Sequence, residues 1–459
     1  MNAIIDERSP RIAALKHALT GNADARFVWL CNFEVENEWA KGFAGLPGGG
    51  VSANGALVQR LEEHGILLAE SGDALITSRP IDLAFLAYLC DAGLPLAQQI
   101  VVADPQEQGT SAAVLASPET LARLRKLGGE GWWLMPMGVS RLEEAIADAT
   151  GLRIAGSDAN TAVKVNSKIY SRRLTDREGI AAIEGRNCER VADLHDALEP
   201  QPFAPYPLIV KEAYGVSGKG LLVLRSAAGA SGLLRMLDRR AARRGDDSVQ
   251  LVVETFLDKR FDLNYQITVA RDGAVSFDFV KQAVTENGVH KGHVIPAALS
   301  DAQHEQIRAA AATIGATLHR DGFFGVAGID ALVDAEDRVR PVLEINARLN
   351  MSTYQTRVLE RFATAQTHAL ARLFPIVVNH GAIRFEQVLD ALGPLAAPPA
   401  NGEGLLITCF GTVDPYEGQR DEANGRLYTM LFAKTAARLA ELDEKASTAL
   451  AVFRQAGGN

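Results

Sequence analysis

The chain contains little cysteine and lacks the segments that mark secreted or membrane proteins. Its 459 residues include only four cysteines, and no two of them form a CxxC pair. That spacing fits neither a zinc site nor a disulfide framework and is typical of a reducing compartment. The N-terminus has no basic segment followed by an apolar one, and no apolar run approaches the length that spans a bilayer. We therefore expect a cytoplasmic protein with no membrane partner.

An excess of positive charge is also absent. The formal net charge is −9, so a nucleic-acid partner, which would favour a basic face, is not expected. The hydrophobic content of 47% and the charged content of 22% are ordinary for a globular protein. The chain is too long for a single core, which predicts roughly two to four domains.

Short apolar runs alternate with helical patterns over the first part of the chain. The runs cover 27–31, 66–69 and 99–103, and a helical pattern covers 83–92. This alternation predicts a parallel α/β layer. A glycine loop at 46–50 follows the first run, and its composition suits a flexible turn and a ligand-contacting loop equally well.

From Gly151 onward the pattern predicts mainly strands and hairpins. A helix is expected over 163–174, with Lys164, Lys168 and Arg172 on one of its faces. A longer, alanine-rich helix is expected over 302–320, and another from Lys434 to the end. The strand-like segments are 207–211, 221–224, 249–254, 263–270, 275–280, 325–333, 339–346, 405–410 and 426–432.

The hairpin of 325–333 and 339–346 carries the strongest chemical signal. Side chains alternate along a strand, so Glu344 and Asn346 point to one face. A turn centred on Asp337 would place Asp330 opposite Glu344. Carboxylate and amide oxygens gathered in this way suit a hard cation such as Mg²⁺. The alternative is an exposed polar face, although apolar neighbours such as Ile329 favour a buried hairpin.

A glycine loop at 215–220 lies between two apolar strands. Its glycines permit backbone shapes in which amide N–H groups approach phosphate oxygens. The loop is neither a P-loop nor a Rossmann fingerprint, because the GxxxxGK[ST] pattern is missing and a strand follows. By itself it would be a turn, but Lys211 ends an apolar strand just before it and requires an anion nearby. The loop and the hairpin together predict a protein that binds ATP with magnesium.

The segment from about Ser157 to Glu360 resembles the ATP-grasp superfamily, because five motifs stand in that family's order and spacing. One lysine lies eleven residues before Gly179, a second precedes the glycine loop, and a glutamate precedes a hinge. The resemblance implies that nucleotide is bound by Lys168, Lys211, Gly215, Ser217, Gly218, Gly220, Glu254, Thr255, Phe256 and Leu257. Lys281 ends a strand and is added as a phosphate or substrate contact, with a solvated polar residue as the alternative.

The resemblance also assigns the metal and the catalytic residues. Asp330, Glu344 and Asn346 are expected to hold two Mg²⁺ ions, for which Mn²⁺ can substitute. Many family members have glutamate where this chain has Asp330. Arg348 is expected to bind the carboxylate and then the tetrahedral oxyanion, and Lys211 to act with it as a catalytic residue. Other polar residues, among them His290, Lys291, His293 and Asn350, suit either a substrate contact or an exposed loop.

The N-terminal region is similar to the pre-ATP-grasp domain, and the whole layout is most like the pheganomycin-type peptide ligases. The resemblance implies an α/β fold with a parallel-sheet N-terminal domain and two α+β subdomains that clamp ATP. The expected domains are 1–155, 156–380 with a lid at about 180–255, and a C-terminal α/β segment at 381–459 that completes the ligase.

The resemblance implies an ADP-forming ligase that joins a carboxylate to an amine through an acyl phosphate. An amino acid or a short peptide is the expected kind of substrate, bacterial specialised metabolism the expected setting, and a homodimer a possible assembly. The alternatives are an ATP-grasp kinase of a small hydroxyl compound and a non-catalytic ATP-binding module. A biotin-dependent carboxylase component is also conceivable, but nothing in the sequence signals a biotinylated domain.

Overall fold

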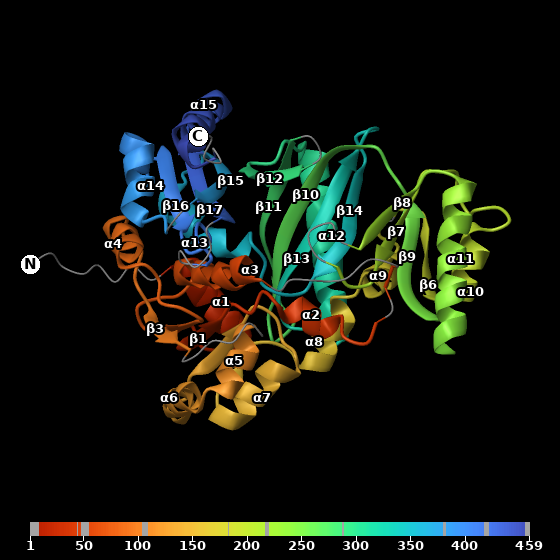
Figure 1. Ribbon diagram of the computed structural model, residues 1–459, viewed down its shortest axis with the longest axis horizontal. Coiled ribbons are helices and arrows are strands. Elements are labelled where there is room, and N and C mark those ends of the chain that lie inside the picture. The colour runs from red at the N-terminus through yellow and green to blue at the C-terminus, as the bar shows by residue number, and fades with distance from the viewer. Residues whose placement is uncertain are drawn as a thin grey trace, which may run out of the picture.

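The computed structural model describes residues 9–43, 45–46, 55–102, 109–181, 183–215, 220–286, 289–379, 382–416 and 422–454. These residues form three β-sheets. In Figure 1 the N-terminal sheet lies below the largest sheet, and the third sheet lies at the right-hand end of the molecule. The mixed α/β architecture confirms the fold class predicted from the sequence. No helix in the described part of the chain is long and apolar enough to cross a bilayer.

The N-terminal sheet is parallel, as its alternating pattern predicts, and has the strand order β3-β2-β1-β4-β5. Its strands are β1 (Phe27–Leu30), β2 (Ala74–Thr77), β3 (Gln98–Val101), β4 (Trp133–Pro136) and β5 (Arg153–Ile154). The associated helices are α1 (Pro10–Thr20), α2 (Val35–Trp39), α3 (Ala56–Arg60), α4 (Leu83–Asp91), α5 (Thr110–Ala116), α6 (Pro118–Gly129) and α7 (Arg141–Thr150).

One strand of this sheet was predicted in the wrong place. The apolar run 66–69 is not a strand, because it lies at the end of the 3₁₀ helix η1 (Leu61–Leu67). Its side chains are fully buried in the core beside the sheet, and a short apolar run buried on all sides has no periodicity that separates helix from strand. The strand at this point in the sheet is β2, only four residues long.

The largest sheet is antiparallel and has eight strands in the order β14-β13-β10-β11-β12-β15-β17-β16. The strands are β10 (Lys259–Val269), β11 (Val275–Glu286), β12 (Val289–Ile295), β13 (Gly325–Asp334), β14 (Val339–Asn346), β15 (His368–Asn379), β16 (Gly404–Cys409) and β17 (Glu422–Ala433). Helix α12 (Asp301–Arg320) buries Ile307 and Ile314 against Tyr265, Ile329 and Ile345. The side chains that alternate with this apolar set face the opposite side of the sheet.

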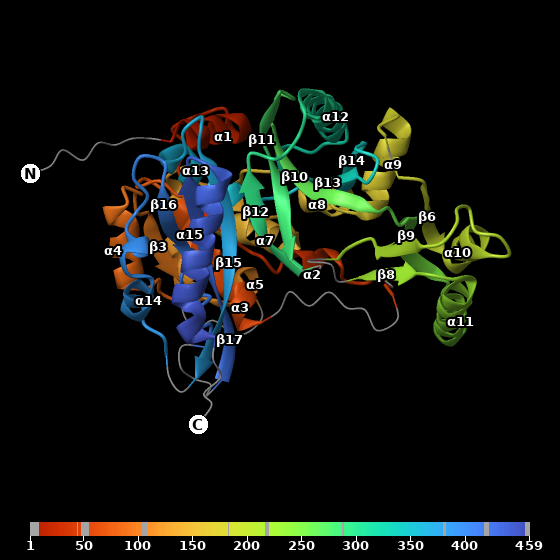
Figure 2. The ribbon, with the colours of Figure 1, turned by 90° about the horizontal axis from the view of Figure 1, so that it is seen from above.

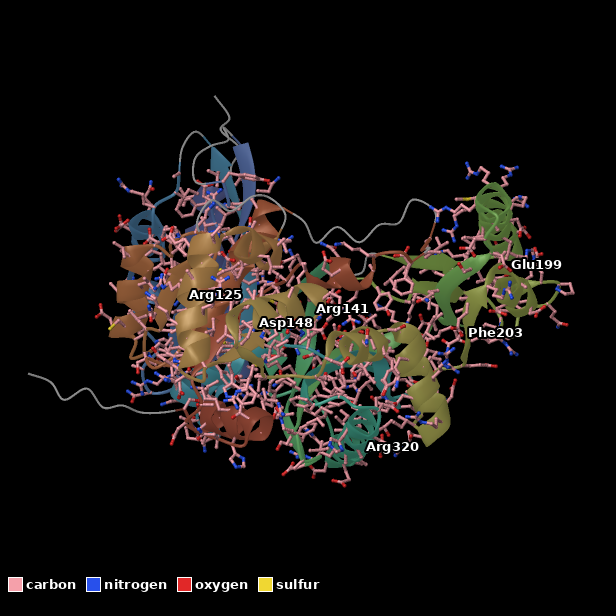
Figure 3. The ribbon with its side chains drawn as sticks, turned by 90° about the horizontal axis from the view of Figure 1, so that it is seen from below. Arg125, Arg141, Asp148, Glu199, Phe203 and Arg320 are labelled. Carbon is pink, nitrogen blue, oxygen red and sulfur yellow. The ribbon has the colours of Figure 1, made fainter. Side chains whose placement is uncertain are left out.

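A third, four-stranded sheet forms a separate layer at the end of the molecule, and we call this layer the lid (Figures 1 and 2). It has the order β6-β9-β7-β8, made from β6 (Gly185–Arg190), β7 (Leu208–Glu212), β8 (Leu221–Leu224) and β9 (Ser248–Thr255). Helices α10 (Val191–Leu198) and α11 (Ala227–Arg244) cover one face and share a core with it. Figure 3 shows Glu199 and Phe203 of the lid at one end of the molecule, away from Arg125 and Asp148 of the N-terminal layer.

The helix predicted over 163–174 is broken in two. Helix α8 (Ala159–Val165) ends at Asn166, and α9 (Lys168–Glu178) begins after Ser167. The Ser167 hydroxyl caps α9 by accepting the N–H of Ile169 at 3.2 Å. The N–H of Lys168 donates to the carbonyl of Ala213 at 3.0 Å, which ties α9 to the lid. Lys164 and Lys168 therefore do not share one helix face.

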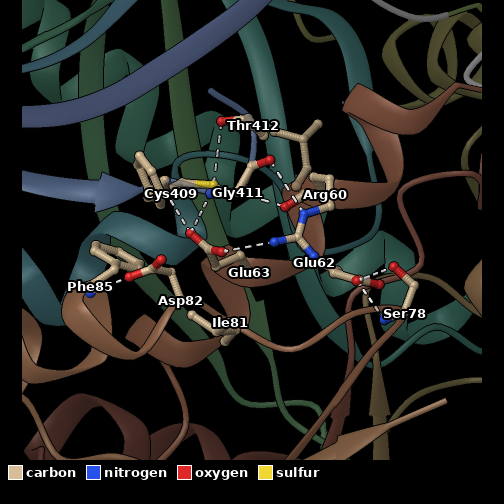
Figure 4. A network of polar contacts seen from close by, with 12 residues as sticks. Arg60, Glu62, Glu63, Ser78, Ile81, Asp82, Phe85, Cys409, Gly411 and Thr412 are labelled. Atoms are coloured by element: carbon tan, nitrogen blue, oxygen red, sulfur yellow. Dashed lines mark hydrogen bonds and ion pairs between the residues drawn. The ribbon is translucent and has the colours of Figure 1, made fainter. Parts of the chain in front are cut away.

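The C-terminal part of the chain adds strands to the eight-stranded sheet and packs against the N-terminal layer. Phe385, on α14 (Phe385–Leu392), has its ring centroid 5.4 Å from that of Phe85 and 5.5 Å from that of Tyr88, both on α4. A second contact is polar (Figure 4): the Glu63 carboxylate on η1 accepts the N–H groups of Phe410 and Gly411 at 2.5 and 2.9 Å. The C-terminal helix is α15 (Ala436–Ala449).

The aromatic contact at Phe385 should contribute strongly to the stability of the packing between the C-terminal part and the N-terminal layer. We expect Phe385→Ala to lower the free energy of unfolding by about 3–5 kcal/mol, because it removes a fully buried ring. Leu83→Ala, at a side chain 82% exposed on the same interface helix α4, should change it by less than about 0.5 kcal/mol. Urea unfolding followed by circular dichroism measures both, and equal effects of the two substitutions would contradict the packing described.

Candidate active site

The hairpin β13–β14 has the register expected from its sequence. Asp330 pairs with Glu344, and Gly328 pairs with Asn346, so the two carboxylates and the amide share one face. That face is the one opposite α12, since Ile329 and Ile345 point into the core beneath. The neighbouring strands continue the row, because Asn264 on β10 pairs with Asp330 and Lys281 on β11 pairs with Asn264.

Asp330 is the electrostatic centre of this row. Its carboxylate accepts the Nδ2 groups of Asn264 at 2.8 Å and Asn346 at 3.2 Å. Part of the residue remains accessible, but desolvation by the surrounding protein and, to a smaller extent, the nearby Glu344 carboxylate raise the pKa of its carboxyl group to about 6. Glu344 Oε1 in turn accepts Lys168 Nζ at 2.7 Å. Two carboxylates at this spacing favour a cation between them.

A small hollow of about 10 Å³ lies between this hairpin and the lid. Its lining includes Lys168, Arg172, Lys211, Glu254 and Val342. Lys211 Nζ lies 2.6 Å from Glu254 Oε2, and Arg172 reaches the other oxygen of Glu254 at 3.7 Å. The structure thus brings both predicted lysines and the predicted glutamate to one hollow, with Lys168 joining it to the hairpin.

The glycine loop begins beside Lys168 and ends beside Glu212. The Gly215 carbonyl accepts Lys168 Nζ at 3.3 Å. Gly220 has φ of 74°, and a Cβ there would collide with the Glu212 carboxylate, so this end of the loop requires glycine. Ser217 and Gly218 lie outside the described residues.

The hinge after Glu254 is placed at the rim of the lid. The N–H of Thr255 donates to Glu184 and that of Phe256 donates to Pro207 at 2.9 and 3.0 Å, so these two groups join lid segments. Phe256 is exposed and Leu257 is half-buried. The contacts of these residues with a nucleotide stay a prediction.

Lys281 differs from the other predicted ligands because its side chain is fully buried. Its Nζ donates to Gln355 Oε1 at 2.6 Å and to the Ser352 carbonyl at 3.2 Å, and it lies over the ring of Phe279. Desolvation lowers its pKa well below the usual value, and the Arg11 charge adds to the effect. The structure therefore attaches Lys281 to the segment after Arg348 and not to the lid.

Arg348 lies next to Asn346, the last of the three candidate metal ligands along the chain. One terminal nitrogen donates to Asn346 Oδ1 at 3.2 Å and also pairs with Glu36 on α2, while the other donates to the Leu349 carbonyl at 3.0 Å. Within the described residues, Arg348 Nε, Asn350 Nδ2 and Asn264 Oδ1 are buried without a hydrogen-bond partner. Unsatisfied buried polar atoms are costly, and their concentration here favours a polar ligand.

Sequence reasoning missed Asn264, Arg172 and Glu36. Asn264 lies on a strand that was predicted, but its neighbour becomes known only when β10 is paired with β13. Arg172 was noted only as part of a helix face. Glu36 carries no local signal, because its partner Arg348 is far away in the chain. No group of three or more His, Cys, Asp or Glu side chains that could hold a metal occurs among the described residues, so two carboxylates and an amide form the candidate set.

Comparisons with known proteins agree with the fold. Residues 63–152 match the family described as Pre ATP-grasp domain, and residues 167–359 match the family described as Carbamoyl-phosphate synthase L chain, ATP binding domain. The butirosin acyl-carrier protein–L-glutamate ligase of Niallia circulans is 30% identical over 202 residues, covering 44% of this chain and 47% of that protein. The match spans less than half of that relative.

Two solved structures share the architecture. N5-carboxyaminoimidazole synthetase from Staphylococcus aureus has a TM-score of 0.52 at 13% identity, with 94% of this chain and 98% of that chain covered. The biotin carboxylase domain of Hydrogenobacter thermophilus 2-oxoglutarate carboxylase, solved with MgADP and bicarbonate, has a TM-score of 0.54 at 11% identity, with 85% and 87% covered. These likenesses show the fold, and the finer similarity to pheganomycin-type ligases stays a prediction. The chain therefore carries a pre-ATP-grasp domain at 63–152 followed by an ATP-grasp domain at 167–359.

Proposed function

We propose that this protein is an ADP-forming ligase that activates a carboxylate as an acyl phosphate and couples it to an amine. The observation that carries the proposal is the continuity of the site. Asn346 contacts Asp330 of the carboxylate pair and also Arg348. The proposed metal ligands are therefore adjacent to the residue proposed to bind the substrate carboxylate. Substrates of the amino acid or short peptide class are proposed, in a biosynthetic setting of bacterial specialised metabolism.

The donor set suits magnesium. Asp330, Glu344 and Asn346 offer the hard oxygen ligands that Mg²⁺ prefers. Burial and the neighbouring Glu344 carboxylate raise the pKa of Asp330, and a bound cation would offset both effects by favouring the ionised form. We propose two ions here, with Mn²⁺ as a substitute. Bound Mg²⁺ would supply neutralisation of the β- and γ-phosphate charge.

The cationic side chains that line the hollow beside the lid suit the phosphates of a nucleotide. Lys168 and Lys211 line it and would contact phosphate oxygens, each exchanging a carboxylate partner for a ligand oxygen. Glu254 and the hinge after it would hold the adenosine. The loop 215–220 would cover the triphosphate and exclude water from the acyl phosphate.

Arg348 would bind the substrate carboxylate and hold it beside the γ-phosphate. A planar guanidinium matches a carboxylate with two parallel hydrogen bonds, and the partnerless Nε of Arg348 and Nδ2 of Asn350 provide donors for such a ligand. After phosphoryl transfer, the same donors would stabilise the oxyanion that forms when the amine attacks. Lys211 would act with Arg348 by holding the nucleotide in line for the transfer.

An ADP-release screen over amino acids and short peptides, paired as acid and amine, tests the proposal when mass spectrometry follows. A ligase releases ADP and phosphate and forms a coupled product. A kinase forms a phosphorylated product with no free phosphate. A protein that binds ATP but forms neither product with any pair would contradict the ligase proposal.

Removing either end of the nucleotide site should abolish turnover. We expect Glu344→Ala and Lys211→Ala each to lower substrate-dependent ADP release by at least about 100-fold. Lys211 supplies a positive charge that balances the transferring phosphate, and Glu344 is a proposed ligand of the cation that does the same. Glu336→Ala serves as the control, since this carboxylate is exposed at the turn of the same hairpin. Near-normal turnover in a folded Glu344 or Lys211 variant would remove that residue from the proposed machinery.

Gly328 lies directly beneath Asn350, and this contact gives a finer test. A Cβ at position 328 would collide with Asn350 Nδ2. We therefore expect Gly328→Ala to displace Asn350 and raise the KM for the acid about tenfold. This is the effect expected when one hydrogen bond to a charged group is lost. Gly232→Ala, where a Cβ meets nothing within 4 Å, is the matched control. Steady-state kinetics decide, and an unchanged KM for the acid would show that Asn350 does not touch it.

A further inference from the structure

We propose that Glu36 is the binding and proton-accepting group for the amine substrate. This role rests on the ligase function proposed above, and it places the binding site of the amine, the second substrate, at Glu36. Glu36 belongs to α2 of the N-terminal layer, and both Figure 1 and Figure 2 show this short helix between that layer and the lid. Its carboxylate pairs with Arg348, and the two side chains are only 10% and 11% exposed.

The ion pair is held by a rigid frame. Trp39 of α2 donates its Nε1 to the Val139 carbonyl at 2.9 Å. The N–H of Leu349, next to Arg348, donates to the Met137 carbonyl at 2.9 Å. Gly138 between these anchors approaches the Trp39 ring so closely that a Cβ would not fit. The segment 137–139 thus fixes the positions of both Glu36 and Arg348.

The segment 137–139 lies at a point of the parallel sheet where the strand order predicts a ligand site. Strands β1 and β4 are neighbours, but the chain after β1 leads to β2 on one side and the chain after β4 leads to β5 on the other. Ligands of open parallel sheets bind at such a switch point, outside the carboxyl ends of the strands. Asn32, which follows β1, exchanges two hydrogen bonds with Gly138 at this point, at 2.9 and 3.3 Å.

Substrate binding at Arg348 changes the charge balance around Glu36. A carboxylate substrate competes with Glu36 for the same guanidinium. Glu36 would then lie as a nearly buried carboxylate with a shared or lost partner, a costly arrangement. An ammonium group beside it restores the balance. The first substrate therefore creates the site for the second, and the amine arrives next to the carbon that it attacks.

The coupling step balances with Glu36 as proton acceptor. The ammonium transfers one proton to the Glu36 carboxylate, and the nitrogen lone pair forms the C–N bond with the acyl carbon. The C–O bond to phosphate breaks, and phosphate leaves with that electron pair. The second proton of the nitrogen passes to the departing phosphate, which gives the amide and hydrogen phosphate. Arg348 faces the oxyanion throughout.

The test separates formation of the acyl phosphate from its use. The common L-amino acids are first screened with MgATP and hydroxylamine, and the acid used is the first one that the wild-type protein converts to a hydroxamate. Hydroxylamine is chosen because it is an amine that is uncharged at neutral pH. The ammonium-bearing amine is glycinamide, or the first amino acid amide that the wild type couples to that acid. Failure of the wild type to form any hydroxamate or amide would overturn the ligase function itself, which is a different result from a failure at Glu36.

We expect Glu36→Gln to form hydroxamate within about threefold of the wild type and to lose at least about 100-fold in kcat/KM for the amide, the usual range for a proton acceptor. Glu38→Gln, on the same helix with its partner Lys41 at 2.5 Å, should change neither rate. Should Glu36→Gln fail to fold, Glu36→Asp should raise the KM for the amine and leave that for the acid unchanged. Unchanged coupling of the amide would overturn the proposal. Equal losses in both assays would also overturn it, because Glu36 would then only position Arg348.

Discussion

The site depends on one pairing, in which Asp330 and Glu344 face each other across an antiparallel hairpin. Burial and the facing Glu344 carboxylate raise the pKa of Asp330, and the pair attracts positive charge, which Lys168 supplies in part. The apolar side chains that alternate with them anchor the hairpin on α12, which keeps both carboxylates on the opposite face of the sheet. The backbone register therefore places two negative charges side by side, and a divalent cation between them would offset their repulsion.

Each layer of the molecule brings one partner to this pair. The lid contributes Lys211 and Glu254 on adjacent strands β7 and β9. The broken helix places Lys168 at the start of α9, where its N–H holds the lid and its ammonium reaches Glu344. The N-terminal layer contributes Glu36 through α2. The polar row of the eight-stranded sheet thus lies where all three sheets converge.

The sequence was most informative where a local rule applied. Alternation along a strand and the symmetry of a short turn gave the pairing of Asp330 with Glu344, which the structure confirms. Extending the row to Asn264 and Lys281 required strand pairing between distant segments. The break before α9 was missed because Asn166 and Ser167 interrupt a helix through a cap, a signal weaker than proline. The Glu36–Arg348 contact was beyond sequence reasoning, because only the folded arrangement of the layers brings these residues together.

The most direct measurement of the central claim is a calorimetric titration of the folded protein with ADP, in the presence of magnesium and again with EDTA in its place. Coordination by the β13–β14 hairpin predicts saturable binding with magnesium that weakens when the metal is removed. A well-folded protein that takes up no adenine nucleotide with magnesium present would contradict the account.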